Sequence, residues 1–431
     1  MYHSPYGDGG ETPVELRELQ AMMSAVADVT VGADATATAT ARSLKLGGLK
    51  TLPIEDDETA ENICHASPQE AEDEDILHIP VIDFAGFSAD GRDAVGRRRI
   101  VTQITEASKA WGMFNIVNHG IPQRLLNELH KQAHEFFALP LDIKEKVNLH
   151  YEGLSASNNY QNHGFLRKLQ PDPLHNSWRE DLAYFSTWDK TKTMIERVWM
   201  DRSTSVVESL HMYLKSMDEL SMNLLEILAE GLGLESNFFS QHLSRQDIDD
   251  KRYYWRVNFY PPCQHTEGTV GMAAHSDPSL LTVLSQDEVS GLQVMKGDRW
   301  VDVLPVPGAL VVNVGDLLEA WSNGTLHSAV HRVVVSKSEE RVSWAFLVSP
   351  PPSVVVQAPE QLIDEGHPRL YKPFLHVDLR IVLQEEIIAA RESGDTRKLL
   401  PKVIFYDFAQ LNNPGRDGII QPSKTGEINR M

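Results

Sequence analysis

The chain is poor in cysteine and in long hydrophobic runs. Its 431 residues include two cysteines, Cys64 and Cys263, too few for the disulfide framework of a small secreted protein. No apolar run reaches the roughly 18 residues that a membrane-spanning helix needs. The N-terminus lacks the basic start and apolar stretch of a signal peptide. We therefore expect a protein of a reducing compartment, the cytoplasm, without a membrane anchor.

Basic residues are also scarce relative to acidic ones. Lys and Arg number 40 against 61 Asp and Glu, which gives a formal net charge of −21. This balance argues against a nucleic-acid-binding surface and against binding to anionic membranes. Hydrophobic residues make up 42% of the chain, enough to bury a sizeable core.

The first 75 residues differ in composition from the rest. They hold 16 Asp and Glu against four Lys and Arg, and they include the stretches ADATATATA and EAEDED. Such a segment buries too little apolar surface to offset the chain entropy lost on folding. We predict an acidic, disordered leader over residues 1–75, with one short amphipathic helix over residues 14–26 as the alternative. A binding surface for a basic partner is another role open to this leader.

Two regions with different patterns of apolar residues follow the leader. In residues 76–250 apolar residues recur at helical spacing, and Gly231 and Gly233 close one long amphipathic helix, VVESLHMYLKSMDELSMNLLEILAEGLGL. Residues 251–380 consist of short β-rich runs separated by turns: YYWRVNFY, SLLTVLSQ, GLQVM, ALVVNV, HRVVV and RVSWAFLV. The order predicts an α+β chain, with a mostly helical region before a β sandwich or barrel. We expect residues 381–431 to form a C-terminal helix and a tail.

The β-rich part contains a candidate metal site. Residues i and i+2 of a strand project to the same face, so His275 and Asp277 can point inward together. His331, at the start of HRVVV, is the third candidate. Two imidazoles and one carboxylate on one face of an octahedral ion leave three positions open, as in non-haem Fe(II) oxygenases.

Most histidines in the chain are expected to be structural. The sequence contains 17 histidines, so pairs with a carboxylate arise by chance. We assign no metal to five of the others, which are His119, His134, His163, His175 and His327.

A candidate carboxylate-binding group follows ten residues after His331. Arg341 and Ser343 present a guanidinium and a hydroxyl on the same face of a predicted strand, which suits a bidentate, charge-assisted grip on a carboxylate. Tyr260, in NFYPPC, could add a second hydroxyl. The alternative for Arg341 alone is a surface arginine on a strand.

Together these motifs resemble a known family. NFYPPC, HSD followed by PSLLTVLSQDEVSGLQV, NVGD, SNGTLHSAVHRVVV and RVS resemble plant 2-oxoglutarate- and Fe(II)-dependent dioxygenases of the isopenicillin N synthase-like superfamily. IPVIDF and WGMFNIVNHGIP resemble the opening segments of that family. The resemblance covers about residues 77–378, and the acidic leader has no counterpart in it.

The resemblance implies a fold and a set of site residues. The fold is a distorted double-stranded β-helix (jelly-roll) core with flanking helices. The implied Fe(II) ligands are His275, Asp277 and His331. The residues implied for the cosubstrate 2-oxoglutarate are Arg341, Ser343, Tyr260 and Asn258. The implied activity is an oxidation by O₂ of a small-molecule substrate, coupled to decarboxylation of 2-oxoglutarate, with ascorbate as reductant. We expect a monomer.

The substrate is open to several interpretations. LLTVLSQDEVSGLQV and NSWRED resemble gibberellin oxidases, which favours a hydrophobic diterpenoid acid. WSNGTLHSAVHRV resembles the auxin-oxidising branch, and jasmonate and flavonoid oxygenases also remain. Loops around the barrel mouth supply substrate contacts, and the candidate pocket residues are Asn159, Tyr160, Trp178, Tyr184, Phe346 and Val348. Two alternatives outside this class are a catalytically silent small-acid-binding protein and an ascorbate-using oxidase without 2-oxoglutarate.

Overall fold

The computed structural model describes residues 77–85, 87, 93–148, 164–169, 177–186, 188–199, 203–243, 253–264, 269–393 and 401–409. The predicted leader, its alternative helix and the predicted tail beyond residue 411 lie outside these ranges. No helix in the described part of the chain is long and apolar enough to cross a bilayer.

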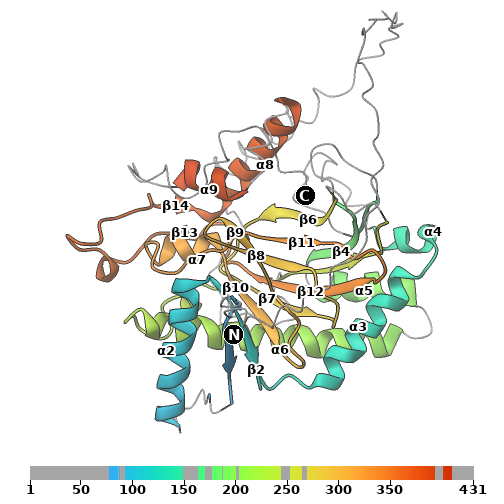
Figure 1. The fold of residues 1–431 in the computed structure, drawn as a ribbon, viewed down its shortest axis with the longest axis horizontal. Helices are drawn as coiled ribbons and strands as arrows, with labels where there is room; N and C mark the ends of the chain where they lie inside the picture. Colours follow the sequence, from blue (N-terminus) through green and yellow to red (C-terminus); the bar gives the residue numbers. More distant parts are fainter. Residues whose placement is uncertain are drawn as a thin grey trace, which may run out of the picture. The chain divides into compact units, whose positions relative to one another are not determined.

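Two β-sheets form the centre of the described body (Figure 1). The larger sheet has eight strands in the order β1-β2-β10-β7-β12-β5-β4-β3, and the smaller has four in the order β6-β11-β8-β9. The larger sheet contains β1 (Val81–Asp83), β2 (Met113–Val117), β3 (Gly164–Lys168), β4 (Arg179–Ser186), β5 (Tyr253–Tyr260), β7 (Leu281–Gln286), β10 (Leu310–Val314) and β12 (Arg341–Val348). The smaller sheet contains β6 (Val270–His275), β8 (Leu292–Lys296), β9 (Arg299–Asp302) and β11 (His331–Val334). Both sheets line one cavity, so the expected jelly-roll core is confirmed.

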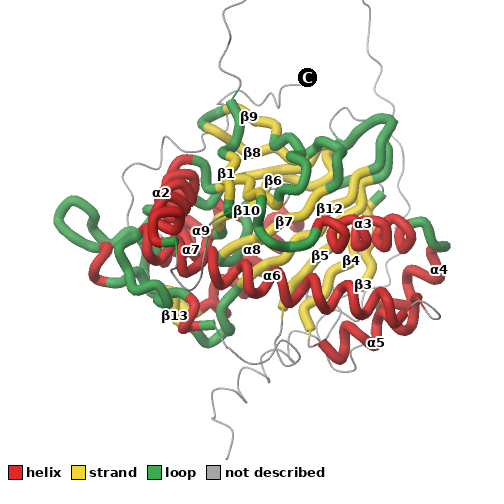
Figure 2. The backbone as a smooth tube through the Cα atoms, turned by 90° about the horizontal axis from the view of Figure 1, so that it is seen from below, coloured by secondary structure: helices red, strands yellow, loops and turns green. Residues whose placement is uncertain are grey.

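The helices and one small strand pair surround this core. The helices are α2 (Ala94–Ala110), α3 (Gln123–Phe137), α4 (Leu141–Lys144), α5 (Trp188–Trp199), α6 (Ser203–Gly231), α7 (Asp316–Trp321), α8 (His376–Ser393) and α9 (Pro401–Ala409). The pair is β13 (Val355–Val356) with β14 (Phe374–Leu375). Figure 2 shows α3 and α6 lying along the larger sheet, and both contact β12. The face of the sheet that meets these helices buries large aromatic side chains such as Trp255, Trp344 and Phe346, so this interface is the main apolar core.

The region expected to be mostly helical also contributes strands. β1 and β2 extend one edge of the larger sheet, and β3 and β4 extend the other. The helix α8 begins at His376, inside the range expected for the β core. The region expected to be helical and the region expected to be β therefore form one body, because residues 76–250 supply the outer strands of the larger sheet.

The predicted long helix is confirmed as α6. Its C-terminal end is a Schellman motif, in which the Leu234 amide donates to the Ala229 carbonyl and the Gly233 amide donates to the Glu230 carbonyl, both at 2.9 Å. Gly233 has φ of +74°, a left-handed conformation that glycine adopts without steric cost. The glycine signal in the sequence therefore correctly placed the end of this helix.

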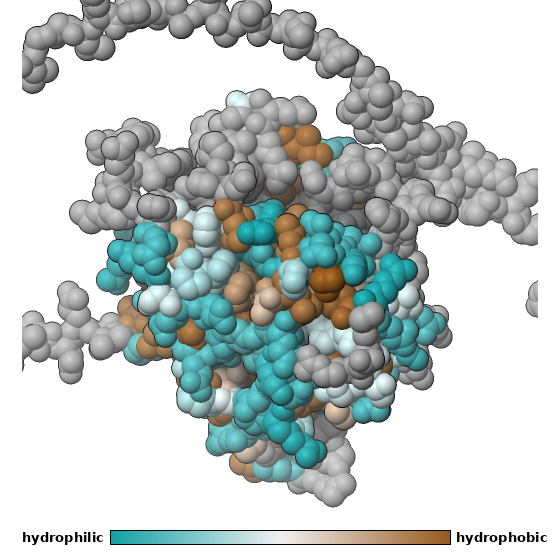
Figure 3. Space-filling view, turned by 90° about the vertical axis from the view of Figure 1, so that its right-hand side faces the viewer, coloured by the Kyte–Doolittle hydropathy of each residue, from teal (hydrophilic) through white to brown (hydrophobic). Residues whose placement is uncertain are grey.

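The surface of the body is mixed in character. Figure 3 shows a face on which hydrophilic residues lie between small groups of hydrophobic ones. Exposed large hydrophobic side chains in the described residues, such as Val95 and Met212, belong to different elements.

Candidate active site

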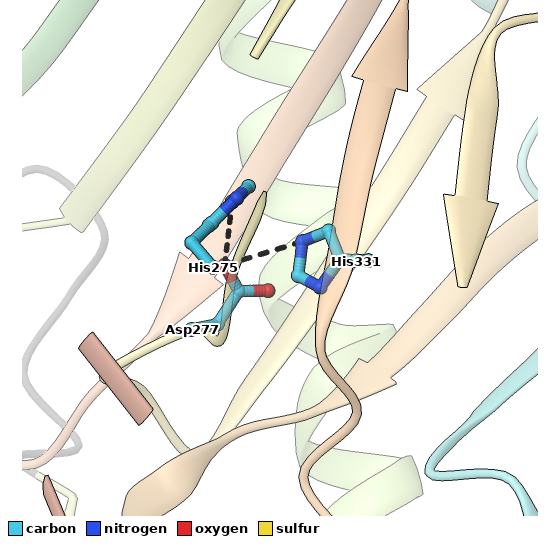
Figure 4. A group of neighbouring side chains, drawn as sticks. All are labelled: His275, Asp277 and His331. Atoms are coloured by element: carbon cyan, nitrogen blue, oxygen red, sulfur yellow. Dashed lines mark ion pairs between the residues drawn. The ribbon is translucent and has the colours of Figure 1, made fainter. Parts of the chain in front are cut away.

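Strand pairing brings the three predicted metal ligands together. His275 ends β6 and His331 opens β11, and the two are direct partners in the antiparallel pairing of these strands. Their ring centroids lie 4.2 Å apart. Asp277 follows in the loop after β6, and its Oδ1 lies 3.7 Å from the Nε2 atom of each imidazole (Figure 4). One ligand atom from each residue lies within 4.8 Å of the others, which is compact enough for a single ion.

Neighbouring groups orient these side chains. The Nδ1 atom of His275 lies 2.8 Å from the Ala273 carbonyl, and that of His331 lies 3.1 Å from the Ala329 carbonyl. A carbonyl only accepts, so Nδ1 carries the proton in both rings and the Nε2 lone pairs face Asp277. The Asn313 amide donates to Asp277 Oδ2 at 3.2 Å, which leaves Oδ1 turned toward the imidazoles.

Burial and mutual charge set the protonation of His275 and Asp277. Burial, followed by the neighbouring His331, lowers the pKa of His275 to about 3, so its imidazole is neutral at pH 7. Burial alone would raise the pKa of Asp277, but the two imidazoles and the hydrogen bonds from Thr282 and Asn313 outweigh it and lower that pKa. The site therefore presents a carboxylate and a neutral imidazole, the forms that bind a cation.

Arg341 lies buried in the same cavity. Its Nε donates to the Val289 carbonyl at 3.1 Å, and its Nη2 donates to Gln286 Oε1 at 2.8 Å. Nη1 lies 3.4 Å from the Ser343 hydroxyl, and the guanidinium carbon lies 5.3 Å from the centre of the Tyr260 ring. These hydrogen-bond partners are neutral, and the Asp287 carboxylate acts on the guanidinium electrostatically. An incoming carboxylate would add a directly hydrogen-bonded charge partner, which favours a buried guanidinium.

The cavity that contains these groups has a volume of about 300 Å³. Its polar wall holds the triad, Arg341, Ser343, Tyr260 and Asn258. The Asn258 Oδ1 atom is buried without a hydrogen-bond partner in the described residues. The wall continues through residues of β5, β12, α8 and α9 and through Ser349 just after β12. The residues of these elements are Tyr254, Arg256, Ala345, Leu347, His376, Arg380 and Pro401. The structure thus brings all seven residues of the predicted metal and cosubstrate sets to one cavity.

Three of the predicted substrate residues lie elsewhere, which corrects that part of the prediction. Phe346 and Val348 are buried on the helix-facing side of β12, and Tyr184 stacks on Trp255 at 5.7 Å in the same apolar core. Side chains alternate along a strand. Since Arg341 and Ser343 face the cavity, the residues of β12 that share their face are Ala345 and Leu347 rather than Phe346 and Val348.

Of the remaining predicted substrate residues, Trp178 alone belongs to the part of the chain that the structure describes. Trp178 is half-buried, and its indole N–H donates to the Pro261 carbonyl at 3.1 Å. It is absent from the cavity wall formed by the described residues. Asn159 and Tyr160 lie outside the described residues.

Sequence analysis missed the wall residues Arg256, His376 and Arg380. Arg256 lies two residues before Asn258 on β5 and so shares its face, a signal that the sequence contained. His376 and Arg380 lie four residues apart on α8, but their place at the cavity depends on how that helix packs against the sheets.

Three histidines expected to be structural have structural contacts. His119 lies 3.1 Å from the Gly308 carbonyl, His134 pairs with Glu340 at 2.8 Å, and His327 lies 3.6 Å from Glu319. His163 and His175 lie outside the described residues.

Comparisons with known proteins place the chain in a family. Residues 253–350 match the 2OG-Fe(II) oxygenase superfamily, and residues 79–201 match the N-terminal region described as non-haem dioxygenase in morphine synthesis. Gibberellin 20 oxidase 1 of Oryza sativa subsp. japonica is 36% identical over 287 residues, which cover 64% of this chain and 74% of the rice protein. Flavonol synthase 1 of Crocosmia x crocosmiiflora is 34% identical over 301 residues, which cover 69% of this chain and 83% of the relative.

Solved structures agree with this placement. The crystal structure of JOX2 in complex with 2OG, Fe and JA superposes with a TM-score of 0.58 at 30% identity, covering 71% of this chain and 84% of JOX2. The dioxygenase for auxin oxidation in rice gives a TM-score of 0.57 at 28% identity, covering 77% of this chain and all of that protein (100%). The chain belongs to the 2OG-Fe(II) oxygenase superfamily and is a 2-oxoglutarate-dependent dioxygenase of the plant type.

Proposed function

We propose that this enzyme binds Fe(II) through His275, Asp277 and His331 and oxidises a small hydrophobic plant carboxylic acid, with a gibberellin-type diterpenoid acid as the leading candidate. The observation that carries the proposal is the convergence of three metal-ligating atoms within 4.8 Å at the wall of a cavity of about 300 Å³. Two imidazole nitrogens and one carboxylate oxygen are the donor set that suits non-haem Fe(II).

Arg341 supports 2-oxoglutarate as the cosubstrate. Its buried guanidinium and the Ser343 hydroxyl would hold the distal carboxylate, with Tyr260 and Asn258 beside it. Iron held by the triad would, with 2-oxoglutarate and O₂, supply the oxidant: one oxygen atom would enter succinate as 2-oxoglutarate loses carbon dioxide, and the other would be available to the substrate. The residues of the chain would fix the cosubstrate at one end, and the Ala273 and Ala329 carbonyls keep both imidazoles in the ligating tautomer.

The cavity wall supports an acidic and largely apolar substrate. Leu347 and Pro401 provide apolar surface, while Arg256 and Arg380 bring two guanidinium groups to the same wall. The Arg256 Nε atom is buried without a hydrogen-bond partner in the described part of the chain. A substrate carboxylate would satisfy that donor with a charge-assisted hydrogen bond.

The relatives support several acids rather than one. The 36% identity to a gibberellin 20 oxidase favours a gibberellin-type acid. The JOX2 complex with JA and the dioxygenases for auxin oxidation support a jasmonate-type or auxin-type acid as the second candidate. A flavonoid, which flavonol synthases among the relatives would suggest, has no carboxylate to meet Arg256.

The test is a product assay. We would incubate the enzyme with Fe(II), ascorbate and 2-oxoglutarate and offer gibberellin precursors, jasmonic acid, indole-3-acetic acid and flavanones one at a time. We expect succinate together with an oxidised product from an acid, lost when 2-oxoglutarate is left out. Product from a flavanone alone would reject the acid proposal, and turnover without 2-oxoglutarate would reject its role as cosubstrate.

We predict that Arg256 recognises the carboxylate of the substrate. Arg256→Met should raise KM for the acid at least about tenfold, because a charge-assisted hydrogen bond contributes about 1.5–3 kcal/mol. The methyl ester of the same acid should show similar KM values with wild-type enzyme and with the variant. Arg167→Met is the matched control, since Arg167 pairs with Glu180 on the opposite face of the same sheet. An equal loss for acid and ester would exclude recognition of the carboxylate by Arg256.

A further inference from the structure

A buried ion cluster lies beside the loops that carry the triad. Lys402 of α9 places its Nζ atom 3.0 Å from Asp316 Oδ1 and 3.0 Å from Glu319 Oε2, both on α7. Their exposed fractions are 1% for Lys402, 0% for Asp316 and 3% for Glu319. A cation so deeply buried is costly unless it is fully paired, so the arrangement fixes α9 against α7.

Asp316 is joined to the segment that carries two of the triad residues. The Ser276 hydroxyl donates to Asp316 Oδ2 at 2.9 Å, and the Asp316 amide donates to the Asp277 carbonyl at 2.8 Å. Ser276 stands between His275 and Asp277 in the chain. The position of the Asp316 side chain therefore bears directly on the geometry of this loop.

The same carboxylate pair holds the segment that leads to the third triad residue. The Ser328 hydroxyl donates to Asp316 Oδ1 at 2.7 Å, and the Ser328 amide donates to Glu319 Oε2. Three residues later the chain reaches His331. Lys402 thus holds a carboxylate pair to which both triad-bearing segments are hydrogen-bonded.

Lys402 also lies next to residues that line the cavity wall. Pro401, the residue before it, lines the cavity, as do His376 and Arg380 of the neighbouring helix α8. Burial would lower the pKa of Lys402, but the two carboxylates outweigh this and raise it, so the ammonium stays charged at neutral pH. The ion cluster therefore joins one wall of the cavity to the triad loops.

We propose that Lys402 is a positioning residue for the metal site, and that docking of the C-terminal helix α9 is coupled through Asp316 to the affinity of the triad for iron. This inference rests on the proposed iron site. Groups that orient metal ligands without touching the ion typically change metal affinity by about ten- to a hundredfold when removed.

The test measures metal affinity rather than turnover. Isothermal titration calorimetry of the metal-free full chain with Mn²⁺, in the presence of 2-oxoglutarate, gives the dissociation constant for a redox-inert probe ion. Lys402→Met should weaken Mn²⁺ binding about tenfold or more, and Lys402→Arg should restore part of it because the charge returns. Lys372→Met is the matched control. The Lys372 ammonium lies 4.4 Å from the ring centre of Phe408, a residue of α9 like Lys402. Among the described residues, the Lys372 ammonium has no contact with the Asp316 and Glu319 carboxylates.

Two further measurements separate positioning from folding. A purely structural role would lower the melting temperature of Lys402→Met while leaving the Mn²⁺ dissociation constant of the folded variant unchanged, which would overturn the inference. If Lys402→Met does not fold, Ser328→Ala decides instead, since it removes one hydrogen bond to Asp316. Unaltered Mn²⁺ affinity in that variant would overturn the inference. Failure of the wild-type protein to bind Mn²⁺ would reject the iron site itself.

Discussion

At the scale of single residues, Arg341 is the group whose surroundings define its role most closely. It is 2% exposed, and the hydrogen-bond partners it has among the described residues are neutral. Burial lowers its pKa, yet an arginine remains charged in proteins. The Asp287 carboxylate also acts on Arg341 electrostatically. A buried guanidinium whose hydrogen-bond partners are all neutral is a site prepared for an anion.

We predict that Arg341→Lys raises KM for 2-oxoglutarate at least about tenfold, because lysine keeps the charge but lacks the planar fork that matches a carboxylate. KM for the prime substrate should change by less than about twofold, since the two ligands use different parts of the wall. Steady-state kinetics with each ligand varied in turn would measure this. Arg332→Lys is the control, because Arg332 stacks on Trp300 at 4.2 Å and lies outside the cavity wall of the described residues. An unchanged KM for 2-oxoglutarate would remove Arg341 from cosubstrate binding.

At the scale of elements, the two faces of β12 have different roles. Residues 341, 343, 345 and 347 line the cavity, whereas Val342, Trp344, Phe346 and Val348 pack toward the helices. β12 pairs with β5 on one side and with β7 on the other. Its register therefore fixes the cosubstrate residues and the core at the same time.

We predict opposite effects from two neighbouring substitutions in this strand. Phe346→Ala should lower the free energy of unfolding by about 3–5 kcal/mol, because it leaves a cavity in the apolar core, with little change in KM of the folded enzyme. Leu347→Ala should cost less stability and raise KM for the prime substrate. Chemical denaturation and steady-state kinetics on both variants measure these effects. The reverse pattern would mean that the two faces of β12 have been assigned wrongly.

At the scale of the whole molecule, the protonation of buried histidines couples folding to pH. Burial, followed by the charge of Arg380, lowers the pKa of His376 from 6.5 to about 4, and its Nδ1 lies 2.8 Å from the Pro350 carbonyl. Between about pH 6.5 and pH 4, His376 is therefore protonated in the unfolded chain but neutral in the folded chain. Stability from this group is complete above pH 6.5 and is lost as the pH falls toward 4.

We predict that the free energy of unfolding falls by about 1–3 kcal/mol from this histidine alone when the pH drops from 6.5 to 4. His376→Gln keeps a donor for the Pro350 carbonyl and does not titrate, so its stability should depend less on pH than that of the wild type. Urea unfolding at several pH values gives the dependence of the free energy of unfolding on pH for the wild type and for the variant. The same dependence of the free energy of unfolding on pH in both proteins would show that His376 is not the titrating group.

Much of the site could be predicted from the sequence because short-range rules place it. The spacing of His275 and Asp277, and that of Arg341 and Ser343, puts each pair on one side of an extended segment regardless of the rest of the fold. The same rule applied from Arg341 would have selected Leu347 and excluded Phe346. For Phe346 and Val348 the prediction therefore differed from the structure in the choice of strand face, and not through missing information.

The sequence by itself determined the residue types of the site, the α+β order of the elements and the end of α6 just before Gly233, because local stereochemistry and periodicity decide these features. Only the tertiary structure decided that His331 pairs with His275 across two strands, that Arg380 lines the cavity, and that Lys402 reaches Asp316. These contacts join segments far apart in the chain. Their geometry follows from how sheets and helices pack together, and no local pattern of residues encodes it.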